Sequence, residues 1–232
     1  LRRQRQMCIR DSVGSLNSKY IKQLIQKEKL EKKQLQGKNE KYIITTVDAP
    51  FNGVKKALVI AGSDRRGTIY GIYELSKQLG VSPWYWWMDV PVVKRAEAYI
   101  LPGIYTDGEP AVKYRGIFLN DEAPCLTSWV KQYYGTDFGD HRFYAQVCEL
   151  ILRLKGNFLW PAMWGWAFYA DDSLNSKTAD EMGVIIGTSH HEPMARNHQE
   201  WARKRNEYGA WNYSTNKKVL DQFFREGIER VK

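Results

Sequence analysis

The stretch YRGIFLNDEAP, residues 114–124, constrains the fold of this 232-residue chain more than any other. It begins with the apolar pattern of a strand and ends in three adjacent polar residues, Asn120, Asp121 and Glu122. Acidic side chains at the carboxyl end of a strand are typical of a (β/α)8 barrel, in which that rim carries the chemistry. The stretch therefore predicts a barrel strand that ends at an active site.

Two later segments repeat this arrangement. NFLWP, residues 157–161, follows a helical pattern and opens into the aromatic loop AMWGWAFYADD. VIIGTS, residues 184–189, follows a shorter polar helix and ends in His190, His191 and Glu192. Strands that alternate with helices favour βαβ units and a parallel sheet, so we expect the polar groups at these strand ends to meet at one rim.

These segments also carry a resemblance. YRGIFLNDEAP, KGNFLWPAMWG, GTSHHEPM and the upstream GSDRRGTIYGIYELSKQLGVSPWYWW resemble, in the same order, the motifs of glycoside hydrolase family 115. The resemblance covers about residues 42–232 and implies a xylan α-1,2-glucuronidase. Such an enzyme removes α-1,2-linked glucuronic acid, or its 4-O-methyl ether, with inversion and without a cofactor. The resemblance further implies that glucuronoxylan or its oligosaccharides are the partners and that the protein is secreted or periplasmic. It is compatible with a homodimer of the full-length protein.

The chain divides into three parts by pattern. Residues 1–41 form a basic segment whose first dozen residues, LRRQRQMCIRDS, lack an apolar period and are interpreted as non-native. A polar surface helix is expected at residues 16–37. Residues 42–108 are interpreted as a small α/β domain that precedes the barrel, and residues 109–232 as an incomplete TIM-barrel catalytic domain.

The small α/β domain is expected to contain two strands and a helix. The strands are predicted at residues 42–47 and 57–61, and the helix at 67–79, where Gly80 would cap its end. The next segment, SPWYWWMDVPV, is rich in aromatic residues. Its tryptophans are interpreted as packing between this domain and the barrel, with a sugar-stacking platform as the alternative; they are Trp84, Trp86 and Trp87.

The barrel part contains only three βα units. Its clearest helix follows Asp140 as a plausible N-cap and has apolar residues at Phe143, Val147, Leu150, Ile151 and Leu154. A second amphipathic helix is predicted at residues 217–231. Because a complete barrel has eight strands in about 250 residues, the chain is interpreted as a fragment that is marginally stable and inactive by itself.

Three acidic residues are candidates for the chemistry. Glycoside hydrolysis normally uses two carboxyl groups on opposite sides of the scissile bond. Asp121 and Glu122 are adjacent in a strand and point in different directions, so they are not an opposed pair. The resemblance favours Glu122 as the catalytic or substrate-contacting group, whereas Asp121 could fix the strand end. Glu192 is a candidate water activator or hydroxyl ligand, with a salt bridge beneath the rim as its alternative.

The substrate-binding candidates are amides, imidazoles and indoles at the same rim. They are Asn120, Asn157, His190, His191, Trp164 and Trp166. The resemblance implies that His191 lies in the pocket. Trp160 lies within the predicted strand and is expected to pack internally against neighbouring side chains. Two consecutive histidines at a strand end tend to diverge and no third ligand has an established spacing, so no metal is predicted.

Composition argues against other function classes. The net charge is +9, but residues 1–41 hold +8 of it, so the body offers no basic surface for nucleic acid. No apolar run approaches the roughly 20 residues of a membrane span. The segment GSDRRGT at residues 62–68 lacks the lysine of a P-loop and the spacing of a dinucleotide fold. A non-catalytic carbohydrate-binding protein remains the alternative to the enzyme.

Overall fold

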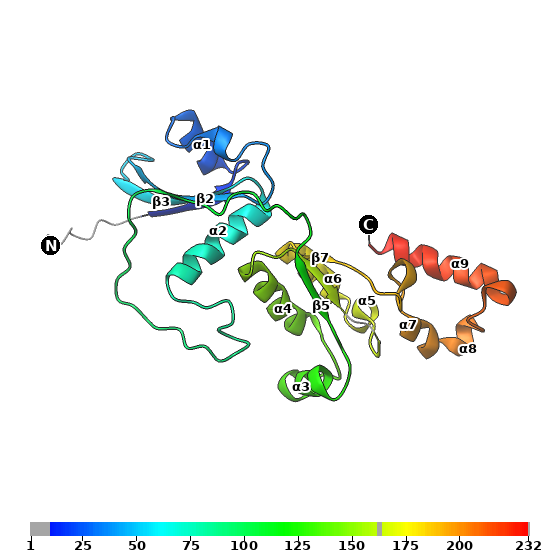
Figure 1. Ribbon diagram of the computed structural model, residues 1–232. Helices are drawn as coiled ribbons and strands as arrows, with labels where there is room; N and C mark the ends of the chain where they lie inside the picture. Colours follow the sequence, from blue (N-terminus) through cyan, green and yellow to red (C-terminus); the bar gives the residue numbers. More distant parts are fainter. Residues whose placement is uncertain (1–9, 162–163, 232) are drawn as a thin grey trace. The chain divides into compact units, whose positions relative to one another are not determined.

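The computed structural model describes residues 10–161 and 164–231, which form two compact units of mixed α/β structure (Figure 1). The first unit comprises Leu1–Lys113 and Leu152–Lys155, and the second comprises Tyr114–Ile151 and Gly156–Lys232. Within the described residues, no helix has the length and apolar character needed to cross a membrane.

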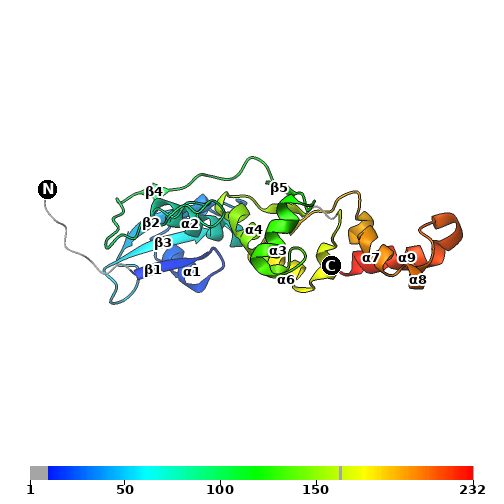
Figure 2. The ribbon, with the colours of Figure 1, turned by 90° about the horizontal axis from the view of Figure 1, so that it is seen from below.

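A four-stranded sheet organises the first unit. Its order is β1 (Arg10–Ser15), β3 (Lys56–Gly62), β2 (Tyr42–Asp48) and β4 (Ile104–Tyr105). Figure 2 shows β3 between β1 and β2, where it pairs in parallel with β1 and antiparallel with β2. The predictions of strands at 42–47 and 57–61 are confirmed. Strand β1 was not predicted, because its sequence RDSVGS has no apolar alternation; pairing along the whole of β3 holds it in place.

Residues 10–12, which belong to the segment interpreted as non-native, form the first half of β1. The interpretation that residues 1–12 are non-native stays a prediction. Residues 1–9, including Cys8, lie outside the described residues.

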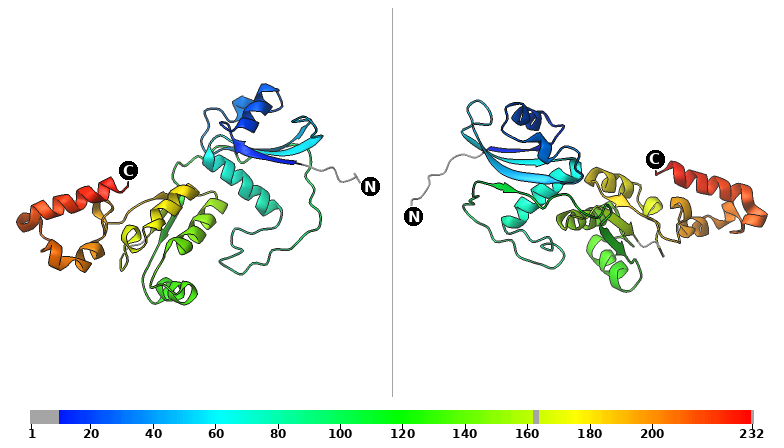
Figure 3. Two further views of the ribbon diagram at one scale, coloured as in Figure 1. Left: turned by 180° about the vertical axis from the view of Figure 1, so that it is seen from behind. Right: turned by 45° about the horizontal axis from the view of Figure 1, so that its top comes forward.

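Helices cover both faces of this sheet, as the two views of Figure 3 show. Helix α1 (Lys19–Gln26) buries Ile21 and Leu24 on one face, and α2 (Arg65–Gln78) packs on the other. The predicted helix over residues 16–37 is too long. It ends at Gln26 because the chain turns, with a positive φ of 55° at Glu28, and returns Leu30 and Leu35 to the same core.

The α2 helix confirms the prediction at residues 67–79, and Gly80 follows it with a positive φ of 99°. Its N-terminus is occupied by an internal carboxylate. Asp64 accepts hydrogen bonds from the Gly67 N–H at 2.9 Å and the Glu40 N–H at 2.6 Å. These amides would otherwise attract a phosphate, so the segment GSDRRGT is a capped helix start and not a nucleotide cradle.

Residues after α2 run in turns and extended chain. Trp86 and Trp87 meet edge to face, with ring centroids 4.7 Å apart, and Trp84 is partly exposed. The interpretation that these tryptophans pack between two domains stays a prediction.

The second unit contains a three-stranded parallel sheet. Its order is β5 (Gly116–Leu119), β6 (Phe158–Pro161) and β7 (Ile185–Ile186). The connections contain α3 (Cys125–Tyr134), α4 (His141–Arg153), α5 (Phe168–Asp171) and α6 (Leu174–Met182). The three predicted strands and their parallel pairing are confirmed, so the carboxyl ends of all three lie at one edge. Helix α3 was not anticipated.

Helix α4 begins as the sequence predicts. The Asp140 carboxylate accepts from the Arg142 N–H at 3.0 Å and the Phe143 N–H at 3.3 Å, and the apolar stripe of α4 is buried up to Ile151. Leu154 is exposed, contrary to the predicted stripe. The left-handed residue after the helix is Lys155, with a φ of 60°. Gly156 is needed for close approach instead, because a Cβ there would lie 2.9 Å from the Arg115 carbonyl oxygen.

Three helices follow β7: α7 (His198–Arg203), α8 (Arg205–Tyr208) and α9 (Tyr213–Glu229). Trp201, Leu220 and Phe223 form their small core. The helix predicted at 217–231 is confirmed for most of its length; it begins four residues earlier. The two described cysteines are free thiols, Cys125 exposed and Cys148 buried, and burial raises the pKa of Cys148 to about 12.

Candidate active site

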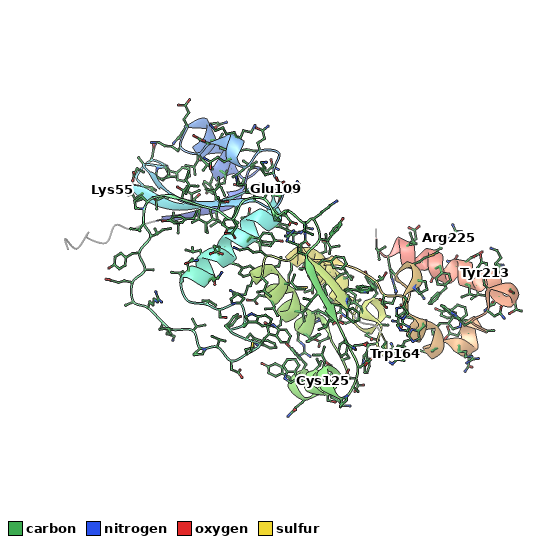
Figure 4. All side chains as sticks on the ribbon, viewed as in Figure 1. Lys55, Glu109, Cys125, Trp164, Tyr213 and Arg225 are labelled. Atoms are coloured by element: carbon green, nitrogen blue, oxygen red, sulfur yellow. The ribbon has the colours of Figure 1, made fainter. Side chains whose placement is uncertain are left out.

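A pocket of about 320 Å³ lies at the carboxyl ends of the strands of the second unit. Its walls come from the segments that follow β5, β6 and β7, and Trp164, on the loop between β6 and α5, is labelled in Figure 4. The lining residues are Phe118, Asn120, Glu122, Trp160, Trp164, Ser189, His190 and His191. The structure therefore brings together five of the nine predicted site residues, contributed by three strand ends.

Glu122 lines the pocket and follows a tight turn at the end of β5. The side-chain oxygen of Asn120 accepts the Glu122 N–H at 2.9 Å, which is the geometry of an Asx turn and fixes where Glu122 leaves the strand. Among the described residues that line the pocket, Glu122 is the one acid. A carboxylate in this position can accept hydrogen bonds from sugar hydroxyls or exchange a proton with a bound ligand.

Asp121 points away from the pocket and anchors the neighbouring loop. Its side chain is 2% exposed, and its carboxylate accepts the N–H groups of Trp164 at 3.2 Å and Gly165 at 3.3 Å. Burial raises the pKa of Asp121, although these N–H bonds oppose the increase. Of the roles considered from the sequence, the geometry favours the one that fixes the strand end. Asp121 thereby sets where the Trp164 backbone lies.

Two aromatic pairs form the apolar walls. Trp164 is 55% exposed and meets the His191 ring edge to face, with centroids 4.7 Å apart. Phe118 and Trp160 are paired in register on β5 and β6, with centroids 5.3 Å apart. The expectation that Trp160 packs internally is wrong, because it shares the pocket face of the sheet with Phe118.

The histidines of the β7 loop form a cluster of rings. The centroids of His190 and His191 are 3.9 Å apart, and those of His191 and His198 are 5.1 Å apart. Burial and the neighbouring His190 and His198 lower the pKa of His191, which favours its neutral form. Within the described chain, no group of three or more histidine, cysteine, aspartate or glutamate residues is arranged to hold a metal ion.

Glu192 does not line the pocket. It is 1% exposed, and burial raises its pKa to about 8, against the opposing hydrogen bonds from Asn197 and Ser189. Glu192 is buried and absent from the pocket lining, so the structure does not bring it to the water-activating position that the sequence predicts. The hydrogen-bond partners of the Glu192 carboxyl group are the Ser189 N–H and the Asn197 amide. Both are neutral donors, so these contacts do not form the salt bridge considered as the alternative.

Asn157 and Trp166 are likewise not part of the pocket. Asn157 lies at the opposite, amino-terminal end of β6, buried, where its side-chain oxygen accepts the Arg115 N–H at 2.9 Å. Trp166 stacks on Phe138, with centroids 5.9 Å apart and ring planes at 18°. Asn157 thus joins the strand starts, and Trp166 packs against the loop before α4.

Sequence reasoning missed Phe118, Trp160 and Ser189 as lining residues. A usable signal existed for the first, because Phe118 lies two residues before Asn120 and strand alternation gives both the same face. Trp160 follows from its register opposite Phe118, which only the sheet pairing reveals.

Comparisons with known proteins identify the family of the chain. The profile of glycosyl hydrolase family 115 matches residues 107–232. No curated protein matches the chain. Among solved structures, a family GH115 4-O-methyl-α-glucuronidase with specificity for decorated arabinogalactans is similar at 35% identity and a TM-score of 0.77. The match covers 93% of this chain and 28% of that protein, so the chain spans just over a quarter of its length. The chain belongs to glycoside hydrolase family 115.

Proposed function

We propose that this chain forms part of a glycoside hydrolase that removes α-1,2-linked glucuronic acid, with or without a 4-O-methyl group, from xylan. The observation that carries the proposal is one pocket in which a single carboxylate, Glu122, faces Trp164, His190 and His191. Its volume of about 320 Å³ is at the lower end of the range of roughly 300–1,000 Å³ for small-molecule sites, which suits one sugar.

Each lining group has a role in this proposal. Trp164 offers an exposed indole on which the C–H face of a pyranose ring can lie. Asn120, His190 and His191 supply hydrogen bonds to hydroxyls or to the uronic carboxylate. The pocket thereby recognises a single acidic sugar as a branch, with the polysaccharide main chain outside.

The proposed reaction inverts the anomeric configuration. One carboxyl group protonates the leaving oxygen and a second activates water on the opposite side of the sugar, about 6.5 to 9.5 Å away. Glu122 supplies one of these two groups. Asp121 and Glu192 are buried with their carboxyl groups turned to backbone and amide donors, so neither supplies the second. We therefore propose that the described chain binds substrate but lacks turnover by itself.

The second unit is proposed to be the first part of a TIM barrel. A parallel sheet of three strands with intervening helices supports this, as does the exposure of Phe118 and Trp160 on one sheet face, since barrel strands direct alternate side chains inward. Glucuronoxylan and its oligosaccharides are the proposed partners, in an exported protein that could be a homodimer. Because the similar solved enzyme has specificity for decorated arabinogalactans, both polymers belong in the assay.

The test uses the intact protein that contains this chain. Release of glucuronic acid from glucuronoxylan and from glucuronidated arabinogalactan is measured for the unaltered protein and for Glu122→Gln. A lost proton-transfer group lowers kcat by about 10²- to 10⁴-fold with little effect on KM. Asp137→Asn is the matched control, because Asp137 is exposed and pairs with Lys131 outside the pocket. Unchanged turnover by Glu122→Gln would remove Glu122 from the mechanism.

A carbohydrate-binding role without catalysis, also in the intact protein, is the second candidate. The pocket with one lining acid among the described residues favours it. Titration of the isolated chain with D-glucuronic acid, followed by NMR, decides whether it binds. Because the proposed function also expects the isolated chain to bind without turnover, the intact protein decides between the two: binding of D-glucuronic acid by the intact protein with no release of sugar from an oligosaccharide supports this role.

A further inference from the structure

Glu192 lies at the centre of the turn that carries the pocket histidines. Its carboxyl group accepts from the Ser189 N–H at 3.5 Å with one oxygen and from the Asn197 side-chain amide at 3.4 Å with the other. Its own N–H donates to the Ser189 carbonyl at 3.0 Å. One side chain therefore joins the two ends of the segment 189–197, and His190 and His191 lie between those ends.

Further hydrogen bonds fix the turn within this segment and join its C-terminal end to α7. The Ser189 hydroxyl accepts the His191 N–H at 3.2 Å, so the two residues that flank His190 are bonded to each other. Asn197 caps α7, where its side-chain oxygen accepts the Gln199 N–H at 2.7 Å. The His198 N–H donates to the His191 carbonyl at 3.1 Å. Any movement of Glu192 would therefore be transmitted to the His191 ring that meets Trp164.

The surroundings of Glu192 favour an uncharged carboxyl group. Tyr144 and Tyr169 are close enough that a charge on Glu192 raises the pKa of each hydroxyl. The nearest cation, Arg230, donates to both oxygens of Glu200 at 2.6 and 3.0 Å and to the Ala195 carbonyl, so its charge is already compensated. The remaining charged neighbours of Tyr144 are Asp121 and Asp171, both acidic.

We propose that Glu192 is a positioning residue, which holds the turn that presents His190 and His191 to the pocket, and that it is not the catalytic base. The proposal rests on the proposed sugar-binding function of that pocket. Ionisation of Glu192 would add a negative charge near Glu200 in a water-poor interior, and would weaken the turn. Sugar binding is therefore expected to decline in alkaline solution as Glu192 loses its proton.

The decisive comparison is between Glu192→Gln and Glu192→Ala in the intact protein. Glutamine keeps the size and one of the two accepting oxygens, and it cannot ionise. We therefore expect kcat at pH 7 within about threefold of the unaltered protein, since no catalytic group is lost, and a rise in KM smaller than that of Glu192→Ala. The decline of sugar affinity in alkaline solution is expected to be absent from Glu192→Gln.

Alanine removes the bridge, and we expect at least about a tenfold rise in KM or in the Kd for D-glucuronic acid, comparable to the loss of a buried hydrogen-bonded partner. Loss of turnover by more than about 100-fold in Glu192→Gln, with sugar affinity kept, would instead identify a catalytic base and overturn the proposal.

A readout without sugar separates this proposal from the proposed function. The ring resonances of His190 and His191 are followed by NMR from pH 6 to 10 in the chain without ligand. We expect a change near the titration of Glu192 in the unaltered chain and none in Glu192→Gln. If no variant binds sugar but this difference is present, the pocket function fails while the positioning role stands. Identical profiles in both chains would overturn the role even if Glu192→Ala fails to fold.

Discussion

The indole of Trp164 meets the imidazole of His191 edge to face, with ring planes at 74° and centroids 4.7 Å apart. This contact joins the loop after β6 to the loop after β7. The Trp164 backbone is fixed at both polar groups, because its N–H donates to Asp121 and its carbonyl accepts the side-chain amide of Gln199 at 3.1 Å. The aromatic wall is thus set before any ligand arrives, which lowers the ordering cost of binding.

Replacing Trp164 tests that wall. We expect Trp164→Ala to weaken binding of D-glucuronic acid about tenfold, since loss of a stacking contact of about 1 to 1.5 kcal/mol corresponds to that factor. Trp164→Phe keeps a flat apolar ring and should lose less. Trp166→Phe is the matched control, because Trp166 stacks on Phe138 and does not line the pocket. Calorimetric titration gives the affinities, and an equal loss in the control would contradict the assignment.

Removal of the Asp121 carboxylate should loosen the same loop from behind. Asp121→Ala leaves the partly buried N–H groups of Trp164 and Gly165 without this acceptor, at a cost for each group at or below the low end of the roughly 1 to 3 kcal/mol for a fully buried one. Amide hydrogen exchange at these two positions is expected to accelerate while exchange in β5 and β6 changes less. Asp121→Asn, which keeps one accepting oxygen, should show a smaller effect. Unchanged exchange in Asp121→Ala would exclude the anchoring role.

The sequence predicts the three strands of the second unit and its helices α4 and α9 because their signals are local, whereas α3 was missed. An apolar run such as that of β6, bounded by Gly156 and Pro161, needs no tertiary information. The pocket positions of Asn120 and Glu122 could also be predicted locally, because both residues come just after the end of a strand. Strand β1 lacked such a signal, since RDSVGS becomes a strand only because β3 offers a free edge.

The direction of single side chains at the rim could not be predicted in the same way. Glu192, Asn157 and Trp166 lie in or beside the right motifs, yet each faces away from the pocket. Their burial depends on partners distant along the chain, such as Arg115 for Asn157 and Phe138 for Trp166. A motif fixes which loop a residue occupies, whereas packing decides the face it presents.

Glu192 should also make stability depend on pH. Its pKa is about 8 in the folded chain and about 4.3 when unfolded, so the folded state binds the proton more tightly between these values. Its contribution is fully present below about pH 4 and is lost as the pH rises toward 8, with a slope of at most about 1.4 kcal/mol per pH unit. Amide exchange in α7, measured at pH 6 and pH 8 and corrected for intrinsic rates, should show this loss. Glu192→Gln should lack it, and an identical pH dependence in both chains would contradict the raised pKa.

Lys155 provides a prediction for the first unit. Its ammonium donates to Glu74 at 2.6 Å, to the Tyr42 hydroxyl at 3.2 Å and to Asp107. Burial alone would raise the pKa of Glu74 and of Asp107, but the hydrogen bonds from Lys155 bring both below their usual values. The stability that these carboxylates contribute is therefore present above their unfolded pKa values, near 4, and is lost as the pH falls through the lower folded values.

Lys155→Met leaves Glu74 and Asp107 as neighbouring negative charges without their shared cation. We expect it to lower the free energy of unfolding of the first unit by about 1 to 3 kcal/mol, less than for a fully buried pair because Asp107 is half exposed. Lys131→Met is the control, since the Lys131 and Asp137 side chains are both mainly exposed and solvent screens such a pair. Amide exchange in β2 and β3 reports this unit separately from the other. Because protonation of the two carboxylates relieves their repulsion, the destabilisation by Lys155→Met should shrink toward pH 4; a penalty that stays constant with pH would show that lost packing, and not lost charge pairing, causes it.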